Sequence, residues 1–353
     1  MSTQLSSVRI VGSGLIGTSI GLGLVQQGVS VQMVDADPKA QSLANDLVGG
    51  ARVVDPELVI LAVPTSQLSA VIDSENQLNP QSTFIDVGSV KNEVVLYVES
   101  ISGLSRRFVP THPMAGREIG GAGSARADLF QGRSWILTPS ADLQPQSKDL
   151  ALKLIAHLGA SPIELSATDH DQAVAKISHL PQIAASLIAK QLAGTPAEWM
   201  ELAGQGLRDT TRIAGSDESL WKEIIYSNRA ELEQLLINLQ NDVAQMIESL
   251  DNPEKIALLM AQGRAGKALI PGKHGGKARE YWYLPIVIDD KPGQLGAIFN
   301  ECAAMEVNVE DLNIEHSPGQ LSALITLALS ENDATKLSNH LAAIGWNVHP
   351  IRK

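Results

Sequence analysis

The segment VGSGLIGTSIG, residues 11–21, constrains the fold of this chain more than any other stretch. Its glycines Gly12, Gly14 and Gly17 follow the G-x-G-x-x-G spacing, directly after an apolar run and before a helical stretch. The first glycine allows a tight turn, the second lets a pyrophosphate approach the backbone, and the third lets strand and helix pack closely. The motif predicts a dinucleotide-binding turn, although a tight strand–helix turn without a ligand can use the same glycines.

An aspartate closes the next apolar run. Asp35 follows VSVQMV and lies 18 residues beyond Gly17. At that distance a carboxylate can accept a hydrogen bond from the adenosine ribose 2′-hydroxyl, and it would repel a 2′-phosphate. We therefore predict a cofactor site for NAD and favour NAD over NADP. We assign to the same site Leu15, Ile16, Val63 and Pro64.

Short apolar runs alternate with helical stretches up to about residue 165. The runs are VRIVGSG, VSVQMVD, LVILAVP, STFIDVG, RRFVPTH and SWILTP. Runs without polar alternation are typical of strands in a parallel sheet that is covered on both faces. Residues 1–165 are therefore predicted to form a doubly wound α/β domain of the Rossmann type, with ligands at the carboxyl ends of the strands. No clear strand stands between Asp35 and Val59, so we expect an abbreviated sheet there.

The rest of the chain divides into three parts. Residues 166–262 carry almost no strand signal and predict an all-helical second domain, with Thr168 and Asp171 resembling a helix capping pair. Residues 263–280 are rich in glycine and lysine and predict a linker or an ordered surface loop. Residues 281–353 have the order βαββαβ of a small ferredoxin-like domain.

One helix of the second segment carries a long apolar stripe at three- and four-residue spacing. The stripe suits a core face within the chain and the seam of a dimer equally well. We expect a homodimer formed through this helical segment. The stripe consists of Leu232, Leu235, Leu236, Leu239, Val243, Met246, Ile247 and Leu250.

Composition excludes several classes of protein. A net charge of −12 argues against binding the phosphate backbone of a nucleic acid as the main activity. The single cysteine, Cys302, allows no disulfide framework and fits a reducing cytosol. There is no apolar stretch near the roughly 20 residues that a membrane span needs, and no signal-peptide pattern at the start. We therefore expect a cytoplasmic protein that does not associate with membranes, and we identify no metal-ligand set.

Two polar residues follow neighbouring predicted strands. Ser89 comes just after STFIDV, and His112 ends the run RRFVPTH. Because the carboxyl ends of parallel strands meet at one edge, a contact between the Ser89 hydroxyl and the His112 imidazole is plausible. A neutral imidazole there can accept a hydroxyl proton while a hydride leaves the same carbon for nicotinamide. The plainer alternatives are a turn residue for Ser89 and a helix or loop cap for His112.

The helical segment contributes further candidates. His179 lies in KISHLPQ, and a lone helical histidine is more often packed or exposed than functional. Arg212 has apolar neighbours and can bind a carboxylate in a bidentate manner, but Asp209 is equally suited to be its ion-pair partner. Trp221 follows shortly after them.

Taken together, several stretches resemble the prephenate/arogenate dehydrogenase family of tyrosine biosynthesis, in order and in spacing. The resemblance runs over nearly the whole chain. The closing segment, with DDKPGQLGAIF and VNVEDLNIEH, resembles an ACT domain, a ligand-sensing module of amino-acid enzymes. The stretches that carry the family resemblance are VGSGLIGTSIG, DVGSVK, THPMAGRE, DLFQGRSWILTP, DHDQAVAKISHLP, RDTTRIAGSDESLW and IPGKHGG.

The resemblance implies NAD-dependent oxidative decarboxylation of prephenate to 4-hydroxyphenylpyruvate and CO2. It assigns His112 as the acceptor of the ring-hydroxyl proton and Ser89 as a support for His112 and the hydroxyl. Arg212 resembles the family arginine that binds the ring carboxylate. The other matching positions are His179, which lines the substrate pocket, Glu118 and Asp209, which have gating or ion-pairing roles in some members, and Trp221, near the substrate.

Three other functions stay open on the sequence. An arogenate dehydrogenase differs only in a substrate amino group in place of the keto group, and no single residue decides between them. A dehydrogenase of 3-hydroxy acids typically uses a lysine where this chain offers His179. A non-catalytic sensor of NAD and amino acids would not need Ser89, His112 and Arg212 together.

The last domain has a candidate regulatory site. Pro292 and Gly293 open a predicted helix whose N–H groups can receive the carboxylate of an amino acid. Asn308, on the following predicted strand, is expected to contact the amino group, and Asp290 is assigned to the same site. The pathway implied by the resemblance suggests feedback inhibition by tyrosine. The alternative is a domain that only helps subunits associate.

Overall fold

The computed structural model describes residues 5–116, 119–270, 281–316 and 322–353. The chain divides into two compact units, Met1–Asn241 and Asp242–Lys353. Within the described ranges, no helix combines the length and the apolar character that crossing a membrane would require.

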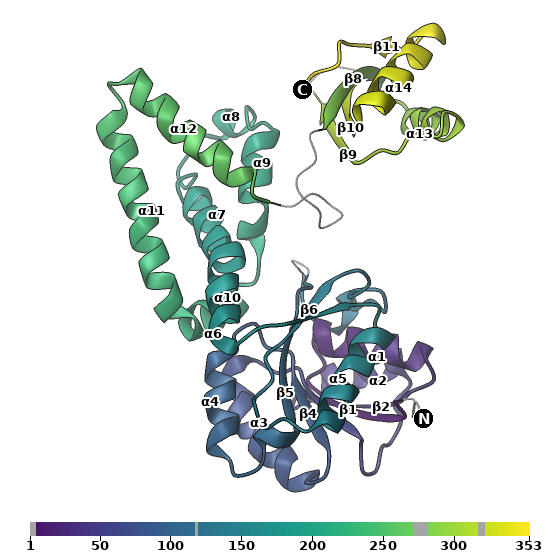
Figure 1. Ribbon diagram of the computed structural model, residues 1–353, viewed down its shortest axis with the longest axis vertical. Helices are drawn as coiled ribbons and strands as arrows, with labels where there is room; N and C mark the ends of the chain where they lie inside the picture. The colour runs from purple at the N-terminus through teal and green to yellow at the C-terminus, as the bar shows by residue number, and fades with distance from the viewer. Residues whose placement is uncertain (1–4, 117–118, 271–280, 317–321) are drawn as a thin grey trace. The chain divides into compact units, whose positions relative to one another are not determined.

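A seven-stranded sheet forms the centre of the first unit (Figure 1). Its strand order is β2-β1-β3-β4-β5-β6-β7, and the strands from β2 to β5 pair in parallel. The prediction of a parallel sheet is wrong at one place, because β6 pairs antiparallel with β5. The strands are β1 (Ser7–Val11), β2 (Ser30–Val34), β3 (Leu58–Leu61), β4 (Thr83–Asp86), β5 (Phe108–Pro113), β6 (Ser134–Leu137) and β7 (Ser161–Glu164).

The sequence did not predict β7. This edge strand is short, contains a proline and is exposed along its whole length, so it lacks the apolar run that marks the other strands. The abbreviated sheet between Asp35 and Val59 is confirmed, because helix α2 (Pro38–Val48) and a loop stand where another strand could lie. As a consequence β3 pairs directly with β1, and the carboxyl ends of β1, β3, β4 and β5 lie at one edge of the sheet.

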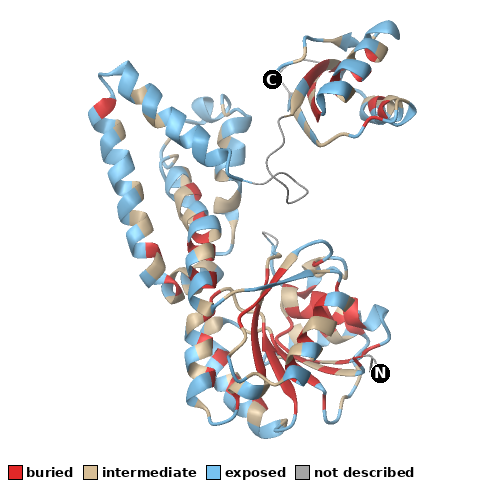
Figure 2. Ribbon diagram, viewed as in Figure 1, coloured by how far each residue is buried: buried red, intermediate tan, exposed pale blue. Residues whose placement is uncertain are grey.

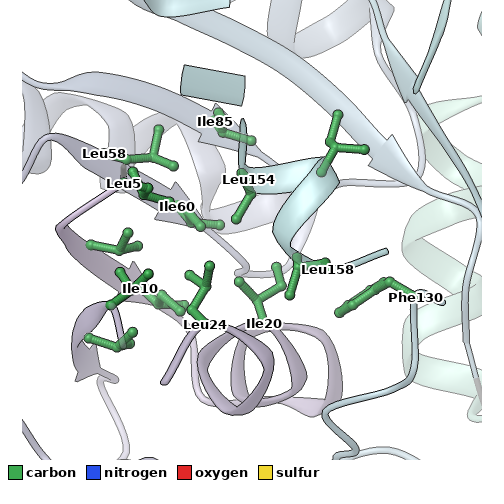
Figure 3. Packing of buried hydrophobic residues seen from close by; sticks show 14 of the residues in the cluster. Leu5, Ile10, Ile20, Leu24, Leu58, Ile60, Ile85, Phe130, Leu154 and Leu158 are labelled. Carbon is green, nitrogen blue, oxygen red and sulfur yellow. The ribbon is translucent and has the colours of Figure 1, made fainter. Parts of the chain in front are cut away.

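Helices cover both faces of this sheet. On one face, Ile20 and Leu24 of α1 and Leu154 of α5 pack against Ile10 and Ile60 (Figure 3). On the other face, side chains of α3 and α4 pack against the intervening strand residues. Double coverage explains why the strands are continuous apolar runs. These helices are α1 (Leu15–Gln26), α3 (Thr65–Leu78), α4 (Asn92–Ser100) and α5 (Pro145–His157).

Helices follow β7. A π-helical turn, η3, interrupts them at Ala175–His179, immediately before α7, which carries Pro181 near its start. A proline is tolerated there because the first N–H groups of a helix have no partner within the helix. The elements are α6 (Ala167–Val174), α7 (Leu180–Lys190), α8 (Ala197–Met200), α9 (Gln205–Thr211), η4 (Arg212–Gly215), α10 (Glu218–Ser227), α11 (Arg229–Ser249) and α12 (Pro253–Lys267).

The apolar stripe lies on α11 and changes character along the helix. Leu232 is buried, whereas Val243, Ile247 and Leu250 are 53%, 64% and 64% exposed. Figure 2 shows α11 and α12 as exposed over most of their length. The first turns of α11 therefore use the stripe as core, and the later turns present it on the surface of the single chain.

The second unit contains a four-stranded antiparallel sheet of order β11-β8-β10-β9. The order of elements along the chain is βαββαβ, as the sequence predicted. Its buried cluster is apolar and includes Leu284, Ile325, Leu327 and Leu337. The elements are β8 (Trp282–Asp289), α13 (Gln294–Ala304), β9 (Asp311–His316), β10 (Ser322–Leu329), α14 (Glu331–Ala343) and β11 (Asn347–Val348).

Two predicted features of the C-terminal region differ from the structure. Helix α12 extends to Lys267, so the first residues of the predicted linker are helical, and residues 271–280 of that linker lie outside the described residues. Asn308 does not lie on a strand, because β9 begins only at Asp311. Its side chain donates to Glu310 Oε1 at 2.9 Å.

Candidate active site

The glycines of the turn between β1 and α1 meet different requirements. Gly12 has a φ of +108°, and a Cβ added there would collide with the carbonyl of Ala62. A Cβ added at Gly17 would collide with the carbonyl of Gly12, whereas one added at Gly14 would have no atom within 4 Å. The fold itself thus requires the first and third glycines, and the second leaves open space at the start of α1.

The polar groups around this turn suit a dinucleotide. The hydroxyl of Ser13 is buried and has no hydrogen-bond partner among the described residues. No side chain caps the N-terminus of α1 at Gly14, so its N–H groups can receive a phosphate. Asp35 accepts from the N–H of Ser13 at 2.6 Å and from the N–H of Asp37 at 2.9 Å. Each carboxylate oxygen keeps a further lone pair for a ribose hydroxyl.

The other predicted cofactor residues flank the same edge of the sheet. Leu15 is buried at the start of α1, and Ile16 next to it is partly exposed. Val63 and Pro64 follow β3, and Pro64 is exposed immediately before α3.

His112 lies on β5 and is joined to a histidine of the helical segment. His112 Nδ1 lies 2.9 Å from Nε2 of His170 on α6, and the two rings meet edge to face. His170 is fully buried, and its Nδ1 lies 2.7 Å from Oδ1 of Asp171. Three side chains thus form a continuous hydrogen-bonded chain from a buried carboxylate to His112.

Asp171 also fixes the start of α4. Its carboxylate accepts from the N–H groups of Lys91 at 2.7 Å and Asn92 at 2.8 Å. The prediction that Thr168 and Asp171 form a capping pair for their own helix is therefore wrong. Asp171 caps α4, and Ser166 caps α6 by accepting from the N–H of Asp169.

A buried ion pair lies beneath β5. The ammonium of Lys91 donates to Asp86, and it also donates to the carbonyl of Thr111, the residue before His112, at 2.7 Å. Both charged side chains are fully buried. A buried ion pair is tolerated only when its remaining donors and acceptors are satisfied, and the carboxylate of Asp86 also accepts from the N–H of Gly88 at 2.9 Å.

His179 is held by an amide. The Nδ2 group of Asn228 donates to His179 Nδ1 at 3.1 Å and to the carbonyl of Asp171 at 2.8 Å. With Nδ1 accepting, the proton of the neutral His179 ring is on Nε2. The ring of Trp221 meets His179 edge to face at 6.0 Å.

The surroundings keep His112 and His179 neutral. Burial lowers the pKa of His112 well below 6.5, and positive charge on Lys91, or on His170 or His179 when either is protonated, lowers it further. Burial lowers the pKa of His179 to about 4, a shift that Asp171 opposes and His170 reinforces. A neutral imidazole can accept a proton, which an imidazolium cannot.

The expected contact between Ser89 and His112 is not found. Ser89 lies partly exposed in the loop after β4 and makes no hydrogen bond to another described residue. The hydrogen-bond partner of His112 is His170 instead. The two residues nevertheless belong to the same edge of the sheet. Ser89 follows β4, and His112 lies near the end of β5, the neighbouring parallel strand.

The remaining predicted substrate residues are placed as follows. Arg212 is the first residue of η4 and is exposed. The side chain of Gln182 on α7 donates to the carbonyl of Ile213, the next residue of η4, at 2.8 Å. Asp209 is exposed on α9 and accepts from the side chain of Gln205 at 2.7 Å. Glu118 lies outside the described residues.

Four residues of this network did not emerge from the sequence as functional candidates: Lys91, His170, Asp171 and Asn228. For two of them the sequence holds a local feature, since His170 lies directly between Asp169 and Asp171 in the first turns of α6. Lys91 follows the strand end in DVGSVK and was included only within the motif.

Comparison with protein families gives two matches along the chain. The family model described as prephenate dehydrogenase, nucleotide-binding domain, matches residues 15–164. The model described as prephenate dehydrogenase, dimerization domain, matches residues 166–261. The two matches together span more than half of the chain.

Individual proteins are similar over most of their length. A probable prephenate dehydrogenase of Streptomyces niveus, NovF, is 29% identical over 96% of this chain and 98% of its own. The crystal structure of prephenate dehydrogenase from A. aeolicus in complex with hydroxyphenyl propionate and NAD+ is 25% identical, covers 76% of this chain and 100% of its own, and has a TM-score of 0.68. The structure of Synechocystis arogenate dehydrogenase is 26% identical, covers 74% and 99%, and has a TM-score of 0.61.

Proposed function

The chain belongs to the prephenate dehydrogenase family, and from that membership we propose that it oxidises and decarboxylates prephenate to 4-hydroxyphenylpyruvate with NAD. The observation that carries the proposal is the neutral, half-buried imidazole of His112 at the edge of the sheet that also carries the open turn at Gly14. An oxidation of a hydroxyl-bearing carbon needs a proton acceptor and a dinucleotide side by side, and this edge provides both positions.

The residues of the chain divide the reaction between them. His112 accepts the proton of the ring hydroxyl while the C–H bond at the same carbon breaks. Bound NAD supplies the acceptor for the hydride. The bond to the ring carboxylate then breaks, CO2 leaves, and the electron pair of that bond makes the ring aromatic. The proton held by His112 returns to the phenolate oxygen, so no other acid is needed.

NAD would bind along the turn between β1 and α1. The start of α1 and the hydroxyl of Ser13 face the phosphates in this proposal, and Asp35 accepts from the adenosine ribose. A carboxylate at Asp35 disfavours the 2′-phosphate of NADP by repulsion between like charges. Leu15, Ile16, Val63 and Pro64 would line the same site.

We assign the substrate contacts by position. Arg212 would bind the ring carboxylate, because a guanidinium matches a carboxylate with two parallel hydrogen bonds. His179 and Trp221, which contact each other, would line the ring. Ser89 would hold the ring hydroxyl toward His112. Asp209 and Glu118 keep the gating or ion-pairing role that the sequence resemblance suggested.

Arogenate is the second candidate substrate. The specific observation in its favour is the similarity to Synechocystis arogenate dehydrogenase over 74% of this chain. The two substrates differ only at the side chain, remote from the hydroxyl that His112 deprotonates, so the same catalytic residues serve both.

We further propose that the enzyme is a cytoplasmic homodimer. The support for the dimer is the exposed apolar surface at the end of α11, formed by Val243, Ile247 and Leu250, the residue directly after the helix. Ile247→Asp should then reduce the mass measured by light scattering to that of one chain. Gln245→Asp is the matched control, since it adds the same charge on another face of α11. A wild-type protein of single-chain mass would contradict the dimer.

The C-terminal sheet unit would act as an ACT-like regulatory domain for tyrosine. Gly293, with a φ of +93°, forms the turn before α13, and Asp290 and Pro292 flank it on an exposed surface. Asn308 would contact the amino group of the ligand. The domain boundaries at 165, 262 and 280 belong to the same proposal.

The test is NADH formation, followed by absorbance, with prephenate or arogenate and with NAD or NADP. Rapid NADH formation from prephenate with NAD is the expected result. Turnover of arogenate alone would keep the mechanism and change the substrate. Lack of turnover with both would refute the proposed function. Adding tyrosine should lower the rate, and a protein whose rate and melting temperature ignore saturating tyrosine would refute the regulatory role.

A further inference from the structure

The hydrogen-bonded chain from Asp171 to His112 determines where protons lie. An ionised carboxylate only accepts, so the 2.7 Å contact between Asp171 Oδ1 and His170 Nδ1 requires a proton on that nitrogen. In a neutral His170 the other nitrogen, Nε2, then carries a lone pair. The 2.9 Å contact between His170 Nε2 and His112 Nδ1 therefore needs the proton of His112 on Nδ1.

We propose that His170 and Asp171 are positioning residues that hold His112 with its proton on Nδ1, so that Nε2 is the atom that accepts the hydroxyl proton of the substrate. The proposal rests on the proposed function for the identity of that hydroxyl, but not for the tautomer itself. Neither positioning residue needs to touch the substrate, because both are buried behind His112.

Asp171, at one end of the hydrogen-bonded series, is held in place by further contacts. Its fixed position determines which nitrogen of His170 and of His112 carries the proton. Its two oxygens also accept from the N–H groups of Lys91 and Asn92 at the N-terminus of α4, where the helix dipole favours a negative charge. The side chain of Lys91 in turn donates to the carbonyl of Thr111, next to His112. Asp171 therefore holds the ring of His112 through His170, and it contacts Lys91, which holds the backbone next to His112.

The same arrangement supports the protonated intermediate. When His112 Nε2 takes the proton, its Nδ1–H bond to His170 becomes a charge-assisted hydrogen bond, which is stronger than a neutral one. The titratable groups that oppose a charge on His112 are Lys91 and, when they are protonated, His170 and His179. Each of the two nearest carboxylates is bonded to one of these groups: Asp171 to His170, and Asp86 to Lys91. The carboxylate behind His170 thus compensates charge as it develops at His112.

Two variants of nearly equal shape separate positioning from packing. In His170→Gln, the amide can donate to Asp171 and accept from His112 Nδ1–H, so the direction of the chain is kept. In His170→Met, the side chain has similar length but offers no comparable donor and only a weak acceptor. The protein used is the full chain, and circular dichroism melting establishes that each variant is folded.

Kinetics give the first measurement. We expect His170→Met to lower kcat by about 10²-fold or more with little change in KM, because the lost group acts only on the proton acceptor. His170→Gln should recover most of kcat. Equal kcat values for the two variants would overturn the proposal, whether both are impaired or both are active.

Nitrogen NMR of the histidine rings gives the second measurement and needs no turnover. The His112 signal is assigned by its loss in His112→Asn. We expect a protonated Nδ1 and an unprotonated Nε2 in the wild type and in His170→Gln, and a change of this pattern in His170→Met. A wild-type His112 with its proton on Nε2 would overturn the proposal. Wild-type protein that turns over neither prephenate nor arogenate would refute the proposed function while leaving this readout intact.

Discussion

The two sheets of the chain bury different kinds of side chain. Around the carboxyl edge of the seven-stranded sheet, charged and polar groups such as Asp86, Lys91, His170 and Asp171 are almost completely buried. In the described residues from 281 to 353, the buried side chains are all apolar. Burying a polar group costs free energy unless it is hydrogen-bonded, so the first region is stable only because its network is nearly complete. The difference indicates that the first region carries a chemical requirement beyond folding.

This contrast predicts two kinds of response to mutation. A change in an apolar core alters stability and leaves chemistry alone, because its contacts are not directional. A change in the polar network alters stability and proton positions together. The predictions that follow test this distinction from the largest effect to the smallest.

His112→Asn should have the largest effect. We expect kcat to fall by about 10²- to 10⁴-fold, the usual contribution of a positioned general base, while substrate binding is retained. The matched control is His340→Asn in the second unit, where the ring contacts Glu301 at 2.7 Å, and it should leave kcat unchanged. Steady-state kinetics and a binding titration measure both. Near-normal turnover of His112→Asn would show that the buried polar network of the first unit does not serve proton transfer.

Asp171→Ala and Leu327→Ala should separate the two regions next. Asp171→Ala leaves N–H groups of α4 and His170 without an acceptor, so we expect a loss of about 2–4 kcal/mol in unfolding free energy together with a loss of activity. Leu327→Ala should cost about 2–5 kcal/mol through the cavity it leaves, with kcat unchanged below its melting temperature. Urea unfolding and kinetics on both variants are the measurements. A fully active Asp171→Ala would show that the polar network serves only stability.

The sequence predicted the framework of the first region better than its network. The glycine turn and the apolar runs predicted the sheet, its abbreviation and the position of His112, because burial and backbone conformation leave local patterns. The run SWILTP predicted β6 but not its antiparallel direction, since the direction of a strand is not encoded in its own residues. The exposed β7 has no apolar run that could mark it. Both strands lie at one end of the strand order of the sheet.

The partners of His112 could not be found from local patterns. His170 lies 58 residues from His112, and Asp171 caps a helix whose first residues lie about 80 positions away. A capping pattern reports that an aspartate suits a helix start, but it does not say which helix. The network therefore forms only in the folded first unit. The sheet of the second unit could be predicted because its apolar runs indicate the order βαββαβ directly.

The pH dependence of stability should be the third effect. The pKa of His179 is about 4 in the folded chain and 6.5 when exposed, so the unfolded chain binds more protons between these values. Stability is therefore fully present above pH 6.5 and falls as the pH decreases toward 4, by on the order of 3 kcal/mol from this group. Urea unfolding across this range should show a smaller slope for His179→Gln than for the wild type. Identical slopes would mean that His179 is not buried in its neutral form.

The smallest effects should come from two glycines that open helices in the two units. Gly14 has a φ of −75° and open space around an added Cβ, so Gly14→Ala should keep its stability and raise the KM for NAD by blocking the approach of the phosphates. Gly293 has a φ of +93°, so Gly293→Ala should cost about 1–2 kcal/mol through backbone strain and leave the KM for NAD unchanged. Thermal melting and NAD titrations measure the pair. If Gly14→Ala lost stability with an unchanged KM, the turn after β1 would be a structural device like that before α13, and the two units would differ less than their buried side chains indicate.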